Sequence, residues 1–348
     1  MLPNGFQDKI IYACSILLSR LINRGKDPQE MDFKTILILR QDEIGDLCYS
    51  TPIFEMLRLR YPNAKISLWC RSFAVSLVQN DPNLDTVFSA KKDLEKKYDL
   101  LVDLRGGWKG MKYALLHPPK FRLERGIVRL KNKRKGQHPH EMQTSFEIIQ
   151  SILKPETILP NPKIYCSTED ENQSINFIEK YQLKHFAIFH TGARRVLRMW
   201  PSERFAELAI HVKKQYGFDI VFIGDKNDVA AINSIRNLIP FTTFSAAGEL
   251  SLSALASFTK NASLYVGNES GPLHIAALSN IPCLGLYGPG EPFVFYPYGK
   301  KSAVLHHILP CNPCNQIHCV HPENPCIGRI TLEEVNEKII ALMKLEHN

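Results

Sequence analysis

Runs rich in apolar residues alternate with amphipathic segments along most of the chain. Short apolar runs predict buried parallel strands over residues 35–39, 65–70, 87–88, 99–104, 186–189, 219–223, 263–266 and 282–287. Helical spacing of apolar positions predicts helices over residues 51–60, 73–79, 110–117, 141–153, 169–181, 203–216, 229–238, 251–259, 272–278 and 332–345. Because strands and helices alternate, we predict an α/β fold with parallel sheets covered on both faces.

The pattern is interrupted at Leu159-Pro160-Asn161-Pro162 and then restarts. A chain of 348 residues with 44% hydrophobic and 22% charged residues is globular and long enough for two domains. We therefore predict an extension over residues 1–30, a first Rossmann-like domain over 31–162, a second over 163–330 and a C-terminal helix over 331–348. We also expect this last helix to cross back to the first domain.

The N-terminal extension has apolar residues at helical spacing from Phe6 to Ile22, with Lys9, Arg20 and Arg24 beside them. Its longest apolar run, residues 10–18, is shorter than the roughly 20 residues that span a bilayer. Two interpretations stay open at this point. The helix lies in the interface of an anionic membrane, or it docks on the protein's own surface.

Lysine and arginine outnumber aspartate and glutamate by 43 to 35, which gives a formal net charge of +8. This surplus favours anionic partners such as nucleotide phosphates, phosphorylated glycolipids or an anionic membrane. A basic stretch lies between Arg122 and Lys135, and its apolar spacing fades after Leu130, so we predict an exposed loop there. Nucleic acid is not an expected partner, because aromatic residues are not interleaved with these cations for base stacking.

Four of the nine cysteines cluster near the C-terminus, at Cys311, Cys314, Cys319 and Cys326. Four thiolates at short spacing can bind Zn²⁺ tetrahedrally, but a clear second CxxC pair is missing. Free thiols or a disulfide are the alternatives, and we predict no metal and no other cofactor. The remaining cysteines stand singly, mostly in apolar runs, and are expected in the core.

Three loops that follow predicted strands carry residues suited to chemistry, because ligands of open parallel sheets bind at the carboxyl ends of the strands. The first loop is Arg40-Gln41-Asp42-Glu43-Ile44-Gly45-Asp46. Gly45 permits close backbone approach, and the Asp46 carboxylate can accept a proton from a substrate hydroxyl. The alternative is that Asp46 only caps the next helix and pairs with Arg40.

The second loop, Asn268-Glu269-Ser270-Gly271-Pro272-Leu273-His274, runs into a helix start whose N–H groups favour a diphosphate. Within it, Glu269 can accept a hydrogen bond from a sugar hydroxyl, and His274 faces either the phosphate or the core. The third loop, Thr191-Gly192-Ala193-Arg194-Arg195, leads to Arg198. Arginine suits phosphate because its planar guanidinium binds two oxygens, although simple surface solvation would also explain these cations.

In combination and in order, these loops resemble glycosyltransferase family 9, the heptosyltransferases of lipopolysaccharide core assembly. The resemblance extends over residues 34–342 and rests on residues 36–40, 44–46, 51–52, 200–205, 267–274 and 286–289. The family implies a GT-B fold of two Rossmann-like domains that face each other across a cleft. It also implies that the N-terminal half binds the acceptor and the C-terminal half binds the donor.

The resemblance further implies an inverting, metal-independent transfer from ADP-heptose, with Asp46 as the general base. Arg198 stands where family members often have Lys and resembles the ligand of the donor phosphates, and Glu269 stands where Asp is frequent. The expected donor-binding residues are Thr191, Gly192, Arg194, Arg195, Arg198, Asn268, Glu269, Ser270, Gly271, Pro272 and His274. The expected acceptor-binding residues are Arg40, Gly45, Arg71, Arg105, Arg122 and Arg125.

The expected substrates are therefore a nucleotide sugar and a lipopolysaccharide core or another anionic glycolipid. No secretory signal with a cleavage site is recognisable, so we expect a cytoplasmic protein with peripheral contact to the inner membrane. Three alternatives remain open: a family member with another nucleotide sugar or acceptor, a sugar-nucleotide epimerase, and a non-catalytic glycan-binding subunit.

Overall fold

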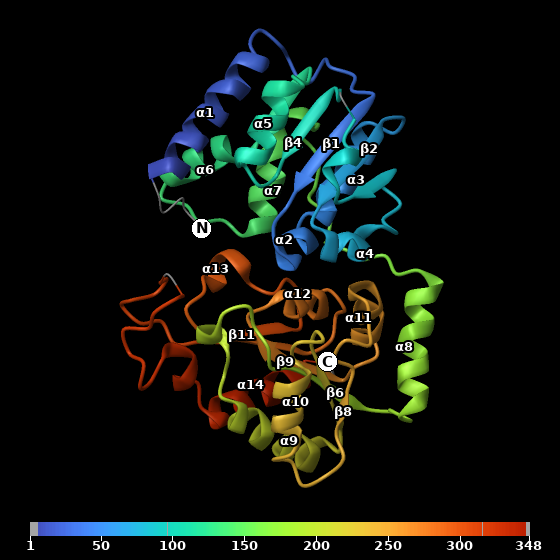
Figure 1. Cartoon of the computed structure of the whole chain (residues 1–348), viewed down its shortest axis with the longest axis vertical. Helices are drawn as coiled ribbons and strands as arrows, with labels where there is room; N and C mark the ends of the chain where they lie inside the picture. Colours follow the sequence, from blue (N-terminus) through green and yellow to red (C-terminus); the bar gives the residue numbers. More distant parts are fainter. Residues whose placement is uncertain (1–5, 96, 315, 346–348) are drawn as a thin grey trace. The chain divides into compact units, whose positions relative to one another are not determined.

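The chain folds into two compact units, residues 1–165 and 166–348 (Figure 1). The computed structural model describes residues 6–95, 97–314 and 316–345, with side chains from residue 10 onward. The unit boundary lies slightly after the boundary predicted at the two prolines, because residues 163–165 still belong to the first unit. Lys163 explains this position, since its backbone N–H donates to the hydroxyl of Thr51 in the first unit at 3.0 Å.

The first unit contains a parallel sheet in the order β3-β2-β1-β4-β5. Its strands are β1 (Thr35–Arg40), β2 (Lys65–Cys70), β3 (Thr86–Phe88), β4 (Leu100–Asp103) and β5 (Phe121–Glu124). Its helices are α1 (Phe6–Ile22), α2 (Ile44–Cys48), α3 (Thr51–Arg60), α4 (Val75–Val78), α5 (Trp108–Leu116), α6 (Arg125–Arg134) and α7 (Glu141–Ile149). The central strand β1 is buried over its last five residues, as its continuous apolar run predicts.

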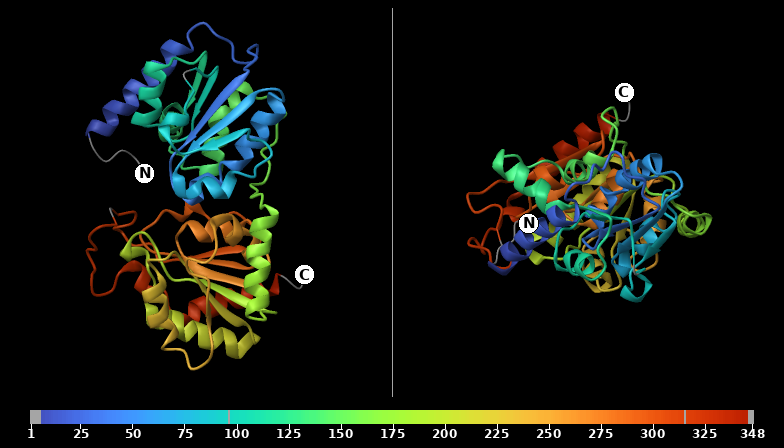
Figure 2. Two further views of the ribbon diagram at one scale, coloured as in Figure 1. Left: turned by 45° about the vertical axis from the view of Figure 1, so that its right-hand side comes forward. Right: turned by 90° about the horizontal axis from the view of Figure 1, so that it is seen from above.

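Helix α1 runs along the outer edge of the first unit beside α5 and α6 (Figures 1 and 2). Its Leu18 and Ile22 pack against an aromatic-rich core cluster that includes Trp69, Phe88 and Tyr113. The docked arrangement of the N-terminal helix is therefore present. The described part of the chain contains no helix long and apolar enough to cross a membrane.

The second unit contains a parallel sheet in the order β11-β10-β9-β6-β7-β8. Its strands are β6 (Phe186–His190), β7 (Asp219–Ile223), β8 (Phe244–Ser245), β9 (Leu264–Asn268), β10 (Cys283–Tyr287) and β11 (Ser302–His306). Its helices are α8 (Thr168–Lys180), α9 (Ser202–Tyr216), α10 (Val229–Arg236), α11 (Leu252–Thr259), α12 (Gly271–Ala277), α13 (Pro292–Phe295) and α14 (Leu332–Lys344). The predicted α/β fold with two parallel sheets is confirmed.

The last helix does not cross back to the first unit, and that prediction is wrong. Helix α14 buries Val335, Ile339 and Leu342 in the core of the second unit, together with residues of β6, β9 and β10. A capping box at its start, in which Thr331 and Glu334 bond each other's backbone N–H groups, fixes where the helix begins.

The basic stretch after Arg122 is not an exposed loop, and that prediction is also wrong. It forms β5 and then α6, whose first turn is capped by the carboxylate of Glu124. Arg122 is fully buried and Arg125 is 5% exposed. Each arginine lies beside a buried acid, and this charge pairing keeps both arginines in the interior. The spacing of apolar residues does not indicate such pairs.

Candidate active site

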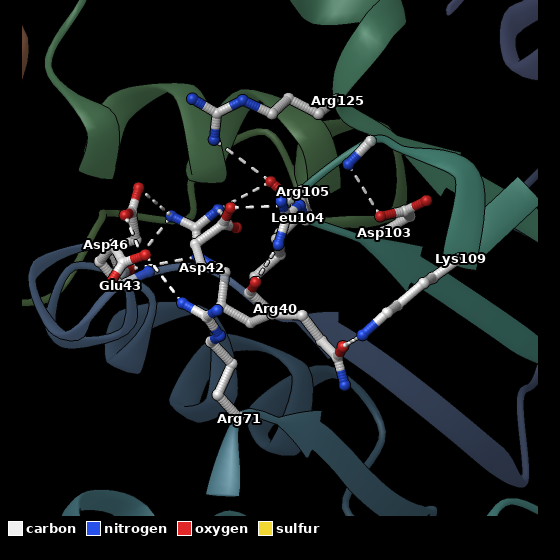
Figure 3. A network of polar contacts seen from close by, with 12 residues as sticks. Arg40, Asp42, Glu43, Asp46, Arg71, Asp103, Leu104, Arg105, Lys109 and Arg125 are labelled. Carbon is white, nitrogen blue, oxygen red and sulfur yellow. Dashed lines mark hydrogen bonds and ion pairs between the residues drawn. The ribbon is translucent and has the colours of Figure 1, made fainter. Parts of the chain in front are cut away.

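The carboxyl end of β1 carries a buried arginine that ties three segments of the first unit together (Figure 3). The guanidinium of Arg40 donates to the Leu104 carbonyl at 2.7 Å, to the Glu141 carboxylate at 2.6 Å and to the Asp46 carbonyl at 3.1 Å. Arg40 is 1% exposed. It therefore holds the turn into α2 against the end of β4 and the start of α7.

Glu141 is the anion at the centre of this network. It accepts hydrogen bonds from Arg40 and, through both carboxylate oxygens, from Arg125. Burial alone would raise the pKa of Glu141, but the two arginines outweigh it and lower that pKa to about 2. Glu141 thus stays ionised at any physiological pH. It lies far from β1 in the sequence, and no local pattern indicated its role.

Asp46 sits in the first turn of α2, next to Arg40 and at the surface of the network. One carboxylate oxygen lies 3.5 Å from Arg40 Nη2, the other accepts a hydrogen bond from the Glu43 backbone at 3.3 Å, and the side chain is 17% exposed. Burial raises the pKa of Asp46 to about 6; Arg40 opposes this, while Glu141 and Asp42 add to it. Capping and pairing are therefore both present. The carboxylate still reaches solvent and is more basic than an ordinary aspartate.

Three cations lie around the loop that leads to Asp46: two follow the strands on either side of β1, and the third lies in α5 (Figure 3). Arg71 follows β2 and contacts Glu43 at 2.8 Å, with its side chain 39% exposed. Arg105 follows β4 and contacts Asp42 at 3.5 Å, with its side chain 47% exposed. Lys109 in α5 donates to the Gln41 side chain. The prediction included the two arginines but missed Lys109, although its place just after Gly106-Gly107 at a strand end was a usable signal.

The five arginines among the predicted acceptor-binding residues thus fall into two groups. Arg71 and Arg105 are exposed beside the Asp46 loop. Arg40, Arg122 and Arg125 are buried and paired with acids, so the structure gives them a role in holding the fold rather than a surface for a ligand. Gly45 is buried within α2.

In the second unit, the ends of the neighbouring strands β6 and β9 are joined by an asparagine. Asn268 donates from its amide to the Thr191 carbonyl at 2.7 Å and accepts from the Trp200 backbone at 3.0 Å. The hydroxyl of Ser270 lies 3.0 Å from His190 Nδ1. Two loops far apart in sequence are therefore fixed to each other at one edge of the sheet.

The same edge holds an ion pair between Arg198 and Glu269, with Nη1 and Oε1 3.2 Å apart. Arg198 also donates to the side chain of Gln316 at 2.8 Å. Glu269 is 5% exposed, and its second oxygen Oε2 has no hydrogen-bond partner among the described residues. Burial raises the pKa of Glu269 to about 7; Arg198 opposes this, and Glu291 adds to it.

Backbone close to Glu269 leaves no room for a side chain. A Cβ added at Gly290 would lie 1.9 Å from Glu269 Oε2. The glycine in the loop after β10 is therefore needed for the buried carboxylate to keep its position.

Comparison with known proteins agrees with this arrangement of two strand-end sites. The family model described as glycosyltransferase family 9 (heptosyltransferase) matches residues 87–324. The chain belongs to glycosyltransferase family 9. Lipopolysaccharide heptosyltransferase 2 of Escherichia coli strain K12 is 24% identical over 362 residues, which cover 89% of this chain and 99% of the relative.

Solved structures agree with the family-9 assignment at the level of the fold. A glycosyl transferase family 9 structure from Veillonella parvula has a TM-score of 0.76 at 20% identity, covering 92% of this chain and all of that one. The E. coli ADP-heptose lps heptosyltransferase II structure has a TM-score of 0.72 at 22% identity, covering 90% of this chain and 100% of that one. The family-9 chain is therefore a glycosyltransferase, as predicted.

Among the donor residues predicted for the family-9 enzyme, the structure brings five together: Thr191, Arg198, Asn268, Glu269 and Ser270. The others lie around them. Arg194 and Arg195 are exposed on the loop after β6, Gly271 and Pro272 are half-buried at the start of α12, and His274 is buried. Gly192 is buried, and a Cβ there would lie 2.9 Å from Asp228, which explains the glycine.

The clustered cysteines of the family-9 enzyme lie in the second unit next to the Arg198 cluster, because Gln316, the partner of Arg198, donates its backbone N–H to Cys314 Sγ at 3.3 Å. All four are free thiols, and with His318 they line a cavity of about 30 Å³. Within the described ranges, no three His, Cys, Asp or Glu side chains form a group that could hold a metal ion. Between the free thiols and the disulfide weighed for this cluster, the structure has the free thiols.

Proposed function

We propose that the enzyme transfers a heptose from ADP-heptose to a sugar of the lipopolysaccharide core, or to a similar anionic glycolipid, with inversion at the anomeric carbon. The family assignment and the heptosyltransferase activity of the E. coli relatives support this choice of donor and acceptor. The observation that carries the mechanism is Asp46, a partly exposed carboxylate at the end of the central strand whose pKa is raised to about 6.

The proposed reaction is a single displacement. Asp46 takes the proton of the acceptor hydroxyl as its oxygen attacks the anomeric carbon of the donor. The bond between that carbon and the diphosphate oxygen breaks, and ADP leaves with the electron pair. Because attack and departure occur on opposite faces of the sugar, the configuration inverts. The Asp46 proton then passes to solvent, which its exposed fraction permits.

Arg198 is proposed to stabilise the negative charge that develops on the departing diphosphate. Its guanidinium already lies in a polar cluster at the strand ends, and a diphosphate would compete there with Glu269. The unpartnered Glu269 Oε2 can accept a hydrogen bond from a donor hydroxyl. On the acceptor side, the exposed Arg71 and Arg105 suit phosphate or carboxylate groups of an anionic core sugar.

We further propose that the enzyme works at the membrane surface, where a lipid-linked acceptor is found. We also propose that transfer needs no resident metal. Arg198 can supply the positive charge that a metal would otherwise supply. If transfer needs no metal, turnover after incubation with EDTA and gel filtration stays within about twofold of that of the untreated enzyme. A loss that Mg²⁺ or Mn²⁺ restores would contradict it.

The decisive experiment uses purified protein, ADP-heptose and deacylated lipopolysaccharide core, with mass spectrometry of the acceptor. We expect a mass gain of one heptose, and Asp46→Asn should lower turnover by about 10²–10⁴-fold. Asp93→Asn is the matched control, since Asp93 is exposed in the same unit, and it should retain full turnover. Full turnover by Asp46→Asn would refute the base assignment.

The same assay separates the alternatives. Conversion of the donor without acceptor would indicate an epimerase. Transfer from a different nucleotide sugar would keep the mechanism and change the donor. Binding of glycan with no turnover of any donor would indicate a non-catalytic subunit.

A further inference from the structure

Helix α1 holds an apolar face toward solvent, while its inner side contains two buried serines beside the packed Leu18 and Ile22. Ser15 and Ser19 are 1% and 0% exposed, whereas Ile10, Leu17 and Leu21 are 47%, 58% and 61% exposed. At 100° per residue the three apolar side chains fall within roughly 40° of one another, on one face of the helix. A surface helix of a water-soluble protein carries polar residues on its solvent face instead.

The serines face inward because they solvate a buried charge. Arg122 donates to the Ser15 carbonyl and hydroxyl, both at 2.9 Å, and to the Ser19 hydroxyl at 3.0 Å. Its remaining partner is Asp103 at 3.1 Å. A buried ion pair without such hydrogen bonds would be costly, so α1 cannot rotate its apolar face inward without leaving Arg122 donors unsatisfied.

Two further contacts fix the same orientation. Asn23 exchanges hydrogen bonds with the Arg122 backbone at 2.8 and 2.9 Å, and Arg129 donates to the Tyr12 hydroxyl at 2.7 Å. Contiguous apolar side chains held toward water by the fold are a sign of an interaction surface.

A basic pocket adjoins this exposed face. It has a volume of about 280 Å³ and lies between α1 and α6, lined by Ile16, Arg20, Ile127, Leu130, Lys131, Arg134 and Lys135. Its four cationic side chains form no ion pair with any residue that the structure describes. The other three lining residues are apolar. A pocket lined by both cations and apolar side chains is complementary to a lipid phosphate and the adjoining part of the acyl chains.

We propose that the face made by Ile10, Leu17, Leu21 and this pocket binds the surface of an anionic phospholipid membrane. The leucines enter the boundary between headgroups and acyl chains, and lipid phosphates meet the cations of the pocket. The apolar face favours a lipid over a nucleic acid, which would require stacking platforms. The proposal rests on the proposed function, in which the acceptor is anchored in a membrane.

The helix that carries the proposed membrane face also contacts the first unit's candidate site through its inner side. A Cβ added at Gly106 would lie 3.6 Å from the ring of Tyr12, so α1 packs against the loop that carries Arg105. An enzyme held by α1 would therefore bring the Asp46 loop and its cations close to glycolipids in the same membrane.

Flotation with lipid vesicles tests the proposal, using the full chain without donor or acceptor. We expect binding to vesicles of phosphatidylcholine with phosphatidylglycerol and little binding to phosphatidylcholine alone. Lys131→Gln/Arg134→Gln should weaken the anionic-vesicle affinity by roughly thirtyfold, which corresponds to about 1 kcal/mol for each cation at the surface. The control Lys91→Gln/Lys92→Gln removes the same charge from an exposed segment of the same unit and should change it less than twofold.

A second variant, Leu17→Ser/Leu21→Ser, tests the lipid contact separately from charge and should also weaken vesicle binding at least tenfold. Equal loss in the lysine control, or no preference for anionic vesicles, would overturn the proposal. So would binding that the leucine variant leaves unchanged and that inorganic phosphate displaces at constant ionic strength, because the pocket would then take free phosphate. Binding to RNA that the leucine variant leaves unchanged would overturn it too.

This outcome is separable from that of the transfer assay. Turnover of the soluble, deacylated acceptor does not require a membrane, so it should persist in all these variants. Vesicle binding without any turnover would leave the membrane proposal standing and contradict the proposed function instead. Unchanged melting temperatures exclude a folding defect as the cause of lost binding.

Discussion

Asp46 and Glu141 share one arginine, yet the pKa of the first is raised and that of the second is lowered. Glu141 receives a 2.6 Å hydrogen bond from Arg40 and a two-pronged one from Arg125, which outweigh burial. Asp46 lies 3.5 Å from the same guanidinium and next to the negative charges of Glu141 and Asp42. The geometry around Arg40 thus yields one permanent anion and one carboxylate able to exchange its proton.

The pH dependence of transfer follows from the raised pKa of Asp46. Since the folded protein holds this proton up to about pH 6, the base is blocked below that pH and free above it. We expect kcat/KM to fall about tenfold per pH unit below pH 6 and to level off above it. Profiles between pH 5 and 8 measure this.

Glu269 titrates nearby, because its pKa is about 7, and must be separated from Asp46. Glu269→Gln should keep the limb near pH 6. A limb that disappears in Glu269→Gln would assign the titration to the donor site and contradict the role of Asp46.

Removal of the Arg198 guanidinium should lower the rate at which the enzyme turns over its sugar donor. We expect Arg198→Ala to lower kcat by about 10²–10³-fold, because one preorganised donor to the developing charge is lost. It would also leave Glu269 buried without its cation, which raises the Glu269 pKa further. Arg198→Lys should recover part of the rate, since charge returns without the two-pronged geometry. Steady-state kinetics with varied ADP-heptose test this, and equal kcat values for Arg198→Ala and wild type would contradict it.

At the scale of elements, most strands and helices could be predicted because their apolar residues repeat at the expected spacing. β5 and α6 could not, because Arg122 and Arg125 are buried by pairing with Asp103 and Glu141, which are 19 and 16 residues away and outside any helical or strand spacing. The loops of the candidate site could be located for a similar reason to the strands, since each follows a strand end. Glu141, Lys109 and the Asn268 contacts depend on which strands become neighbours, which the sequence pattern does not fix.

The contact between α1 and β5 makes a prediction about stability. Ser19→Ala leaves a donor of the buried Arg122 without its partner and should lower the free energy of unfolding of the first unit by about 1–3 kcal/mol. Alanine is the better helix former, so Ser76→Ala in α4 should cause no such loss. Urea denaturation measures the change, and hydrogen exchange in α1 should increase in Ser19→Ala alone. Equal stability of Ser19→Ala and wild type would mean that water replaces the serine.

At the scale of the whole molecule, the candidate base and the donor cluster belong to different compact units, each with its own core. The proposed base function of Asp46 and the proposed binding of the donor should therefore be separable by mutation. We expect Asp46→Asn to bind ADP-heptose within about twofold of wild type by calorimetry, because no donor residue lies in its unit. Arg198→Ala should lose donor affinity while keeping the acceptor affinity. If Asp46→Asn lowers the donor affinity as strongly as Arg198→Ala does, donor binding is not confined to the second unit.

The pairing of α1 with Arg122 also has a consequence for the growing polypeptide. Ser15 leaves the ribosome 107 residues before its arginine partner. At synthesis rates of about 5–20 residues per second, this delay lasts roughly 5–20 s. During that time the nascent chain lacks the arginine that binds Ser15 and Ser19, while the exposed leucines of α1 are already present. Under the membrane proposal, a lipid surface near the ribosome would meet α1 before β5 exists, so the order of synthesis would allow α1 to bind lipid ahead of folding.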